Sequence, residues 1–252
     1  MFRIGLTLAL LSSVYAFGQS RGPRPARLEN PGDFAFVRGE FGVNNRVVTS
    51  APYSAQAVTQ FAQALADGSH IQRSTTGSVV RDSEGRTRTE RSVESIGALS
   101  ASGNRAHTVF IQDSVAGVSY VLNPGNHTYR QMKARGPHDF GQARPRPQAS
   151  TANVKREELG TQSMQGLTVQ GKRITRTIAV GEAGNDRPIE VVNETWFSPD
   201  LQVVVMSKTS DPRFGETSYQ LTNLIRAEPD HALFTVPAEY TLQQPGRPAP
   251  ER

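Results

Sequence analysis

The stretch HIQRSTTGSVVRDSEGRTRTERSV, residues 70–93, decides the fold class. Two segments rich in β-branched and hydroxyl side chains, His70 to Arg81 and Arg86 to Val93, flank the residues Asp82-Ser83-Glu84-Gly85. A glycine in this place supplies the positive φ of a tight reversal, so the stretch predicts a β-hairpin. Charged and hydroxyl residues alternate in the second segment, which indicates a strand with one face in water.

The same pattern recurs along most of the chain. Turn residues such as Asn123-Pro124-Gly125-Asn126 and Ser198-Pro199-Asp200 separate the apolar runs at a spacing of about ten to twelve residues, which is typical of an antiparallel sheet. Further strands are expected at Glu40–Thr49, His107–Asp113, Gly117–Asn123, Thr128–Met132, Met164–Ala179 (interrupted at Gly166 and Gly171), Pro188–Phe197, Leu201–Thr209 and Glu216–Arg226. The predicted fold is mainly β: a curved antiparallel sheet, open and half-barrel-like, with one or two short helices.

Residues 55–66 carry two conflicting signals. Val58, Phe61, Ala62 and Leu65 follow the i, i+3, i+4, i+7 spacing of a helix. Asp67-Gly68, directly before the next strand, is a hairpin signal and favours a strand instead. Near the other end, Pro229-Asp230-His231-Ala232-Leu233-Phe234 predicts one short helical turn.

The chain begins with the pattern of a secretory signal peptide. Met1-Phe2-Arg3 is followed by a mostly apolar run to Phe17, and small residues precede an expected cut before Gln19. There is no cysteine, which excludes disulfides and thiolate metal sites. We expect a signal peptide over 1–18, a flexible leader over 19–32, a β-rich domain over 33–242 and a disordered tail over 243–252. The domain is read as one unit, or as two similar halves joined by a basic, proline-rich loop at about 133–153.

The formal net charge is +5, and the cations gather in two places. Arg86 and Arg88 lie in the hairpin, where they can bind an anionic surface or pair with Asp82, Glu84 and Glu90. The second group surrounds the proline-rich loop, which is either an anionic-surface contact or a solvated linker. The candidate contacts with an anionic surface are Arg86, Arg88, Lys133, Arg135, Arg144 and Arg146. No nucleic-acid recognition motif accompanies the charge, so nucleic acid is not an expected partner.

Several blocks resemble a family of exported proteins of unassigned function common in soil bacteria of the Acidobacteria type. They are Arg81-Asp82-Ser83-Glu84-Gly85-Arg86-Thr87-Arg88, Thr195 to Gln202 and Ser210 to Glu216. The ending Pro229-Asp230, Leu233 to Pro237 and Tyr240 is similar to that of half-barrel periplasmic proteins related to the lipoprotein carrier and the sigma-E regulatory sensor. This second resemblance implies an open, curved sheet whose concave face takes a lipid or acyl chain.

No motif points to catalysis, a cofactor or a metal. The five histidines stand at no zinc-binding spacing, and there is no nucleophile elbow or phosphate-binding glycine loop. The aromatic residues in the best-defined strands are typical of a core, but on an open half-barrel they can line the concave face instead. The candidate ligand contacts are therefore Trp196, Phe197, Tyr219 and Phe234.

These observations predict a non-enzymatic envelope protein, periplasmic or extracellular, without an integral membrane span after signal cleavage. Its expected ligand is apolar or amphipathic, a lipid or acyl chain, held on the concave face of the sheet. The alternative is a structural or regulatory module that contacts an envelope protein partner through its sheet edges and the basic loop. A hydrolase with an unfamiliar site is a third hypothesis, which clustered carboxylates in a cleft would support.

Overall fold

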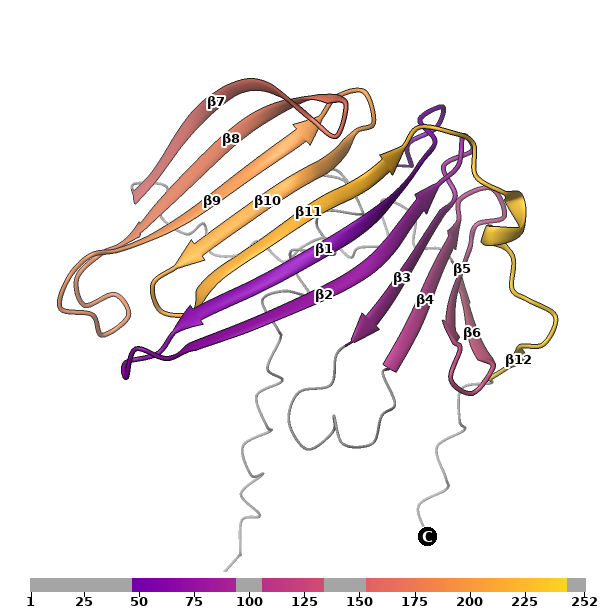
Figure 1. The fold of residues 1–252 in the computed structure, drawn as a ribbon, viewed down its shortest axis with the longest axis horizontal. Helices are drawn as coiled ribbons and strands as arrows, with labels where there is room; N and C mark the ends of the chain where they lie inside the picture. Colours follow the sequence, from indigo (N-terminus) through magenta and orange to yellow (C-terminus); the bar gives the residue numbers. More distant parts are fainter. Residues whose placement is uncertain (1–46, 94–105, 134–152, 244–252) are drawn as a thin grey trace, which may run out of the picture.

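A computed structural model describes residues 47–93, 106–133 and 153–243, and these residues form one open sheet of twelve strands (Figure 1). The strand order is β12-β6-β5-β4-β3-β2-β1-β11-β10-β9-β8-β7, antiparallel throughout except that β12 pairs with β6 in parallel. The elements are β1 Tyr53–Ala64, β2 His70–Arg81, β3 Thr87–Val93, β4 Ala106–Asp113, β5 Val118–Asn123, β6 Thr128–Lys133, β7 Val154–Met164, β8 Leu167–Ile178, β9 Ile189–Ser198, β10 Val203–Asp211, β11 Gly215–Ile225, the 3-10 turn η3 His231–Phe234, and β12 Thr241–Leu242. The expected curved, mainly antiparallel open sheet is confirmed.

The sheet consists of two meanders that meet along one seam. Strands β1 to β6 follow one another in space, as do β7 to β11, and β1 pairs with β11 to join the two series. Consequently β6 and β7, which follow each other in the sequence, lie far apart, with nine strands between them.

Residues 53–64 form a strand, which settles the conflict between the helical spacing and the hairpin signal. Tyr53, Ala55 and Ala57 are buried in alternation, the period of a strand. β1 pairs with β2 over its whole length and with β11 along most of it, so its backbone groups are satisfied by the sheet rather than by a helix. The Asp67-Gly68 turn makes the β1–β2 hairpin, with Gly68 at φ 83°.

The hairpin of residues 70–93 is also present. Gly85 adopts φ 80°, and a Cβ built on it would come within 2.6 Å of Val47 Cγ1, so a glycine is required both for conformation and for space. The turn at Pro229–Phe234 is the expected helical turn, begun by Asp230, whose carboxylate accepts a hydrogen bond from Ala232 N.

The expected strand Met164–Ala179 is wrong in its boundaries. Gln165 and Gly166, both at positive φ, form a two-residue turn of the kind that suits a hairpin, and a strand lies on either side. β7 begins at Val154, directly after the expected loop of 133–153, and is a strand that was not expected from the sequence. Gly171 does not interrupt β8: the Trp196 ring lies against it, 2.5 Å from where a Cβ would stand. The expected strand at Glu40–Thr49 falls mostly outside the described residues; 47–49 are not in a strand.

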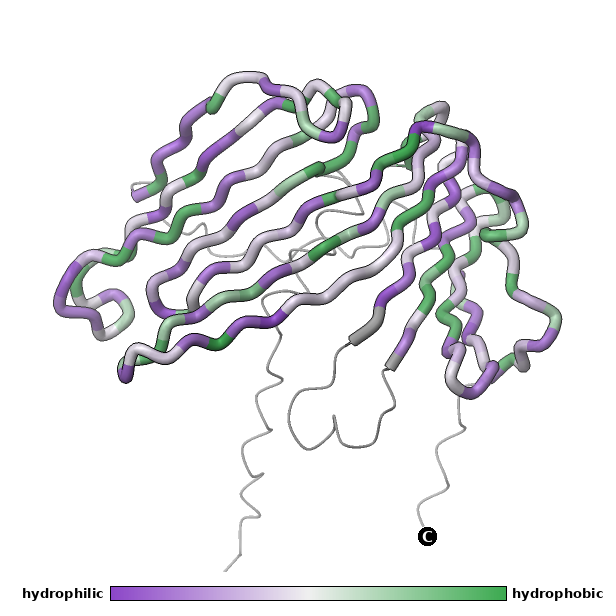
Figure 2. Tube along the Cα trace, viewed as in Figure 1, coloured by the Kyte–Doolittle hydropathy of each residue, from purple (hydrophilic) through white to green (hydrophobic). Residues whose placement is uncertain are grey.

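Two apolar clusters stabilise the sheet. The first cluster consists of Ala51, Tyr53, Ala55, Ala57, Val79, Leu167, Val169, Leu201, Val203, Val205, Tyr219 and Leu221. The second cluster consists of Val80, Val109, Ile111, Leu122 and Phe234, with Tyr120, Tyr129, Val236 and Tyr240 partly buried against it. Figure 2 shows apolar and polar residues alternating in short stretches along the strands. Each cluster takes its members from several strands.

Candidate functional site

A groove of about 580 Å³ lies on the sheet across β11, β1, β2, β3 and β4. It is a shallow hollow that lies open to solvent. Its lining is mostly polar: Ser54, Ala55, Gln56, Thr76, Gly77, Ser78, Val80, Glu90, His107 and Asn223.

The strand register builds this groove. Gln56 lies opposite Ser78, Ser78 opposite Glu90, and directly opposed residues share a face of an antiparallel sheet. From the other side, β11 contributes Asn223, which stands at an irregularity in the β1–β11 pairing with φ 52°. Asparagine tolerates this left-handed conformation better than most residues, and here its amide donates a hydrogen bond to Gln56 Oε1 at 3.3 Å.

Glu90 is the central polar group of the groove. One carboxylate oxygen lies 2.9 Å from His107 Nε2, while the other accepts a hydrogen bond from Ser78 Oγ at 3.3 Å and lies 3.6 Å from an Arg88 nitrogen. A serine nucleophile needs a histidine between hydroxyl and carboxylate. Here the carboxylate stands in the middle, so the three residues can bind a polar group but have no triad geometry.

The polar row continues into an apolar one. Glu90 lies opposite Val109, and Val109 opposite Leu122, so Gln56, Ser78, Glu90, Val109 and Leu122 form one row across five strands. Val109 and Leu122 belong to the second cluster. Val80 belongs to both regions, because it lines the groove and is packed in the second cluster. The groove therefore has a polar half and an apolar border on the same face.

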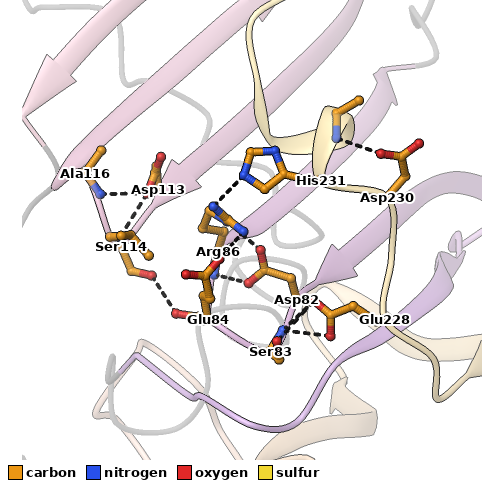
Figure 3. Close-up of polar contacts among 12 residues, drawn as sticks. Asp82, Ser83, Glu84, Arg86, Asp113, Ser114, Ala116, Glu228, Asp230 and His231 are labelled. Carbon is orange, nitrogen blue, oxygen red and sulfur yellow. Dashed lines mark hydrogen bonds and ion pairs between the residues drawn. The ribbon is translucent and has the colours of Figure 1, made fainter.

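The apolar border is covered by residues 226–243, which we call the C-terminal strap. Its Phe234 is 2% exposed and lies within the second cluster. Figure 3 shows the strap against the β2–β3 hairpin tip, where Arg86 is the central group. Arg86 Nη1 lies 2.8 Å from His231 Nε2, and the Phe234 ring centroid is 5.6 Å from Arg86 Cζ.

Arg86 also neutralises a buried carboxylate. Asp82, 1% exposed, accepts hydrogen bonds from the backbone N of Arg86 at 2.8 Å and from its Nε at 2.5 Å, and Arg86 pairs with Glu84 as well. The hydrogen bond that Arg86 donates to the Asp82 carboxylate is the main cause that raises the pKa of Arg86 above its ordinary value. Because an arginine only donates, His231 Nε2 accepts in this contact and carries no proton there.

The candidate ligand contacts of the sequence analysis do not assemble around the groove. Tyr219 is fully buried in the first cluster, and Trp196 packs against that cluster. Phe197 lies half-buried in β9, opposite Val204. Phe234 alone borders the groove, through the second cluster. Their role as ligand contacts on a concave face stays a prediction.

The candidate anionic-surface contacts also lie in different parts of the molecule. Arg86 is buried and ion-paired, and Arg88 pairs with Glu90 and donates to Leu233 O at 3.2 Å, which is the pairing alternative of the sequence analysis. Lys133 is exposed and lines a second hollow of about 450 Å³ with Val118, Met132 and Leu242. Arg135, Arg144 and Arg146 lie outside the described residues.

Sequence reasoning missed Ser78, His107 and Asn223 as site residues. Because residues two apart share a face of a strand, Glu90 is expected on the same side as Arg88, but no local signal shows that the strands bring Gln56, Glu90 and His107 together. Within residues 47–93, 106–133 and 153–243 no three histidine or acidic side chains are grouped as a metal site. Those same residues include no helix long and apolar enough to span a membrane.

No family model matches the chain, and no curated protein matches it in sequence. Solved structures with a similar chain path include MucB in the Pseudomonas aeruginosa MucA/MucB complex, with 13% identity and a TM-score of 0.42 over 82% of this chain and 62% of that chain. LprF from Mycobacterium bovis has 15% identity and a TM-score of 0.32, over 75% and 90% of the two chains. A LolA-superfamily protein from Nitrosomonas europaea has 7% identity and a TM-score of 0.31, over 81% and 97%. The chain thus spans about 62% of the MucB chain.

Proposed function

We propose that this chain is a non-enzymatic, exported binding protein that takes an amphipathic ligand, a lipid or acyl chain with a polar head, on one face of its open sheet. The observation that carries the proposal is the row Gln56–Ser78–Glu90–Val109–Leu122, in which polar and apolar side chains succeed one another on one face. The polar half can hydrogen-bond a head group, and the apolar border, which meets the groove at Val80, can contact a hydrocarbon chain.

The chemistry of the groove favours a head without net charge. Its neutral donors and acceptors include Gln56, Thr76, Ser78 and Asn223. Its carboxylate, Glu90, already has His107 and Arg88 as partners. A strongly charged head would have to compete with those pairs, whereas hydroxyl, amide or zwitterionic groups can bind beside them.

The test is lipid analysis of the full chain purified from an exporting bacterial host, followed by binding of a fluorescent acyl probe. We expect copurified amphiphile in the mass spectrum and probe binding weakened by about tenfold in His107→Ala, which removes a group within the groove. His70→Ala, exposed at the start of β2, is the matched control. Ligand-free protein together with equal probe binding by both variants would exclude the groove as the ligand site.

The exposed edge of the sheet supports a second candidate, a protein-interaction module. β7 is the last strand of the described sheet on its side, and its outer backbone groups can pair with an added strand. Its charged residues Lys155, Arg156, Glu157 and Glu158 and the positive φ of Gly160 are features that also protect edges from unwanted pairing. Partner capture lost in Arg156→Glu but kept in Arg226→Glu, an exposed site after β11, would favour this candidate.

A further inference from the structure

The C-terminal strap is held by the buried ring of Phe234, by Val236 and Tyr240, which are partly buried against the second cluster, and by hydrogen bonds along its length. Apart from Phe234, the residues of the strap are exposed or half-buried, and Val236 and Tyr240 are among the half-buried ones. Glu228 accepts hydrogen bonds from Ser83 N and Oγ at about 3.1 Å, and farther along Thr241 N and Gln243 N donate to the β6 side at 2.8 Å. A segment with a single fully buried side chain opens at a lower free-energy cost than the strands it covers.

Phe234 is the buried member of the second cluster that comes from a turn rather than from a strand. The other four buried members of the second cluster, Val80, Val109, Ile111 and Leu122, come from neighbouring strands and point to one face of the sheet. Without Phe234 this face would be an open apolar patch that begins at the groove, because Val80 lines both. The ring therefore occupies the space next to the polar half of the groove.

We propose that Phe234 holds the place of the ligand's apolar chain: binding displaces the strap, and the chain of a single-chain amphiphile packs on Val80, Val109, Ile111 and Leu122. The head then lies in the groove by Glu90 and His107. This inference rests on the proposed function and adds the ligand class, an amphiphile with one hydrocarbon chain, and the regulation of the site by the strap.

Binding exchanges one apolar group, the Phe234 ring, for another, the hydrocarbon chain. The chain buries the four strand residues that Phe234 buried, so the hydrophobic contribution is largely replaced rather than added. The closed strap reduces the fraction of protein that is competent to bind and weakens the apparent affinity by that fraction. Loosening the strap should therefore strengthen ligand binding, the opposite of what deletion of a direct contact does.

The experiment measures the affinity of the full chain for lysophosphatidylethanolamine by calorimetry, below the concentration of micelle formation. Glu228→Ala removes the strap's hydrogen bonds to Ser83 without touching the apolar face, and we expect about tenfold tighter binding. Phe234→Ala should also bind more tightly, and Phe214→Ala, 56% exposed at the β10–β11 turn, is the matched control that should not. Should Phe234→Ala fail to fold, Glu228→Ala decides alone.

Hydrogen exchange gives the second readout. The amides of Leu233 and Thr235 donate within the turn, and we expect the ligand to speed their exchange in the wild type. Tighter binding in the strap variants together with faster amide exchange supports the proposal. Binding by Glu228→Ala when the wild type does not bind supports it as well. If the wild type binds but the variants bind equally and the amides do not respond, the displacement is wrong while the binding function stands. If no form binds, both are wrong.

Discussion

The two clusters of this sheet are closed in different ways. The first cluster is built mainly from strands, with Ala57, Val79, Val205 and Leu221 contributed by neighbours in the sheet. The second cluster is completed by Phe234, which comes from a short turn after the last long strand. The difference teaches that a sheet region covered by its own strands is permanent, whereas the region covered by Phe234 can be exposed by opening the turn η3 while β1 to β11 stay paired.

The largest effect should come from Arg86→Met, at the point where the strap meets the hairpin. The substitution leaves Asp82 buried without its partner, which typically costs about 3 to 5 kcal/mol. Urea unfolding measures the loss, and the double variant with Asp82→Asn should recover part of it. A loss below about 1 kcal/mol would mean that water reaches Asp82 and that the hairpin tip is not a closed contact.

Leu221→Ala and Leu122→Ala compare the clusters directly. Both leucines are essentially unexposed, and each substitution should cost about 2 to 5 kcal/mol. Hydrogen exchange should separate them: Leu221→Ala should lower protection across β1, β10 and β11, and Leu122→Ala mainly in β4 to β6 and the strap. Equal loss of protection everywhere would show that the sheet is a single cooperative unit and contradict the comparison.

Gly171→Ala tests how tightly the first region is packed. The added methyl group would stand 2.5 Å from the Trp196 ring, so the ring must move, and we expect a loss of about 1 to 3 kcal/mol. Thermal unfolding of the wild type, Gly171→Ala, Trp196→Leu and the double variant gives a double-mutant cycle. The added methyl should be tolerated better in the Trp196→Leu background, and additive effects would rule out the clash as the cause.

The smallest effect concerns Asp211 and Arg213 at the β10–β11 turn. The hydrogen bonds from Arg213 lower the pKa of Asp211, so the folded protein holds this proton less readily than the unfolded chain. The stabilisation is therefore present above the unfolded pKa of about 4 and is lost as the pH falls through the folded pKa. Asp211→Asn should cost less than about 1 kcal/mol at neutral pH and nothing in strong acid. An equal difference at both pH values would assign the effect to turn geometry.

The sequence predicted the strands whose residues alternate and whose ends carry turn residues, among them the hairpin around Gly85 and the turn at Asp230. It did not predict β7, which begins just after the expected loop of 133–153, because VKREELGTQSM has few apolar residues to mark a strand. An edge strand buries little, so it needs little apolar sequence. Strand boundaries at Gly166 and Gly171 differed for another reason: one glycine makes a turn and the other makes room for Trp196.

The groove was beyond sequence reasoning for a physical reason. Its residues are brought together by cross-strand register, and a shift of one residue would turn Ser78 or Glu90 to the other face. The irregularity at Asn223 is likewise a property of the β1–β11 pair rather than of either strand. The spacing of the histidines along the chain gave no indication that His107 would face Glu90.

The seam between β1 and β11 has a consequence for how the chain reaches its fold. Thr222 Oγ1 bonds Gln56 O across 166 residues of sequence, whereas the hairpins on either side form between near neighbours. Closing such a long loop is entropically costly and slow, so the two meanders should form first, each with an unsatisfied edge. During synthesis the edge of β1 stays unpaired until β11 has been made, and misassembly between molecules would begin at that edge.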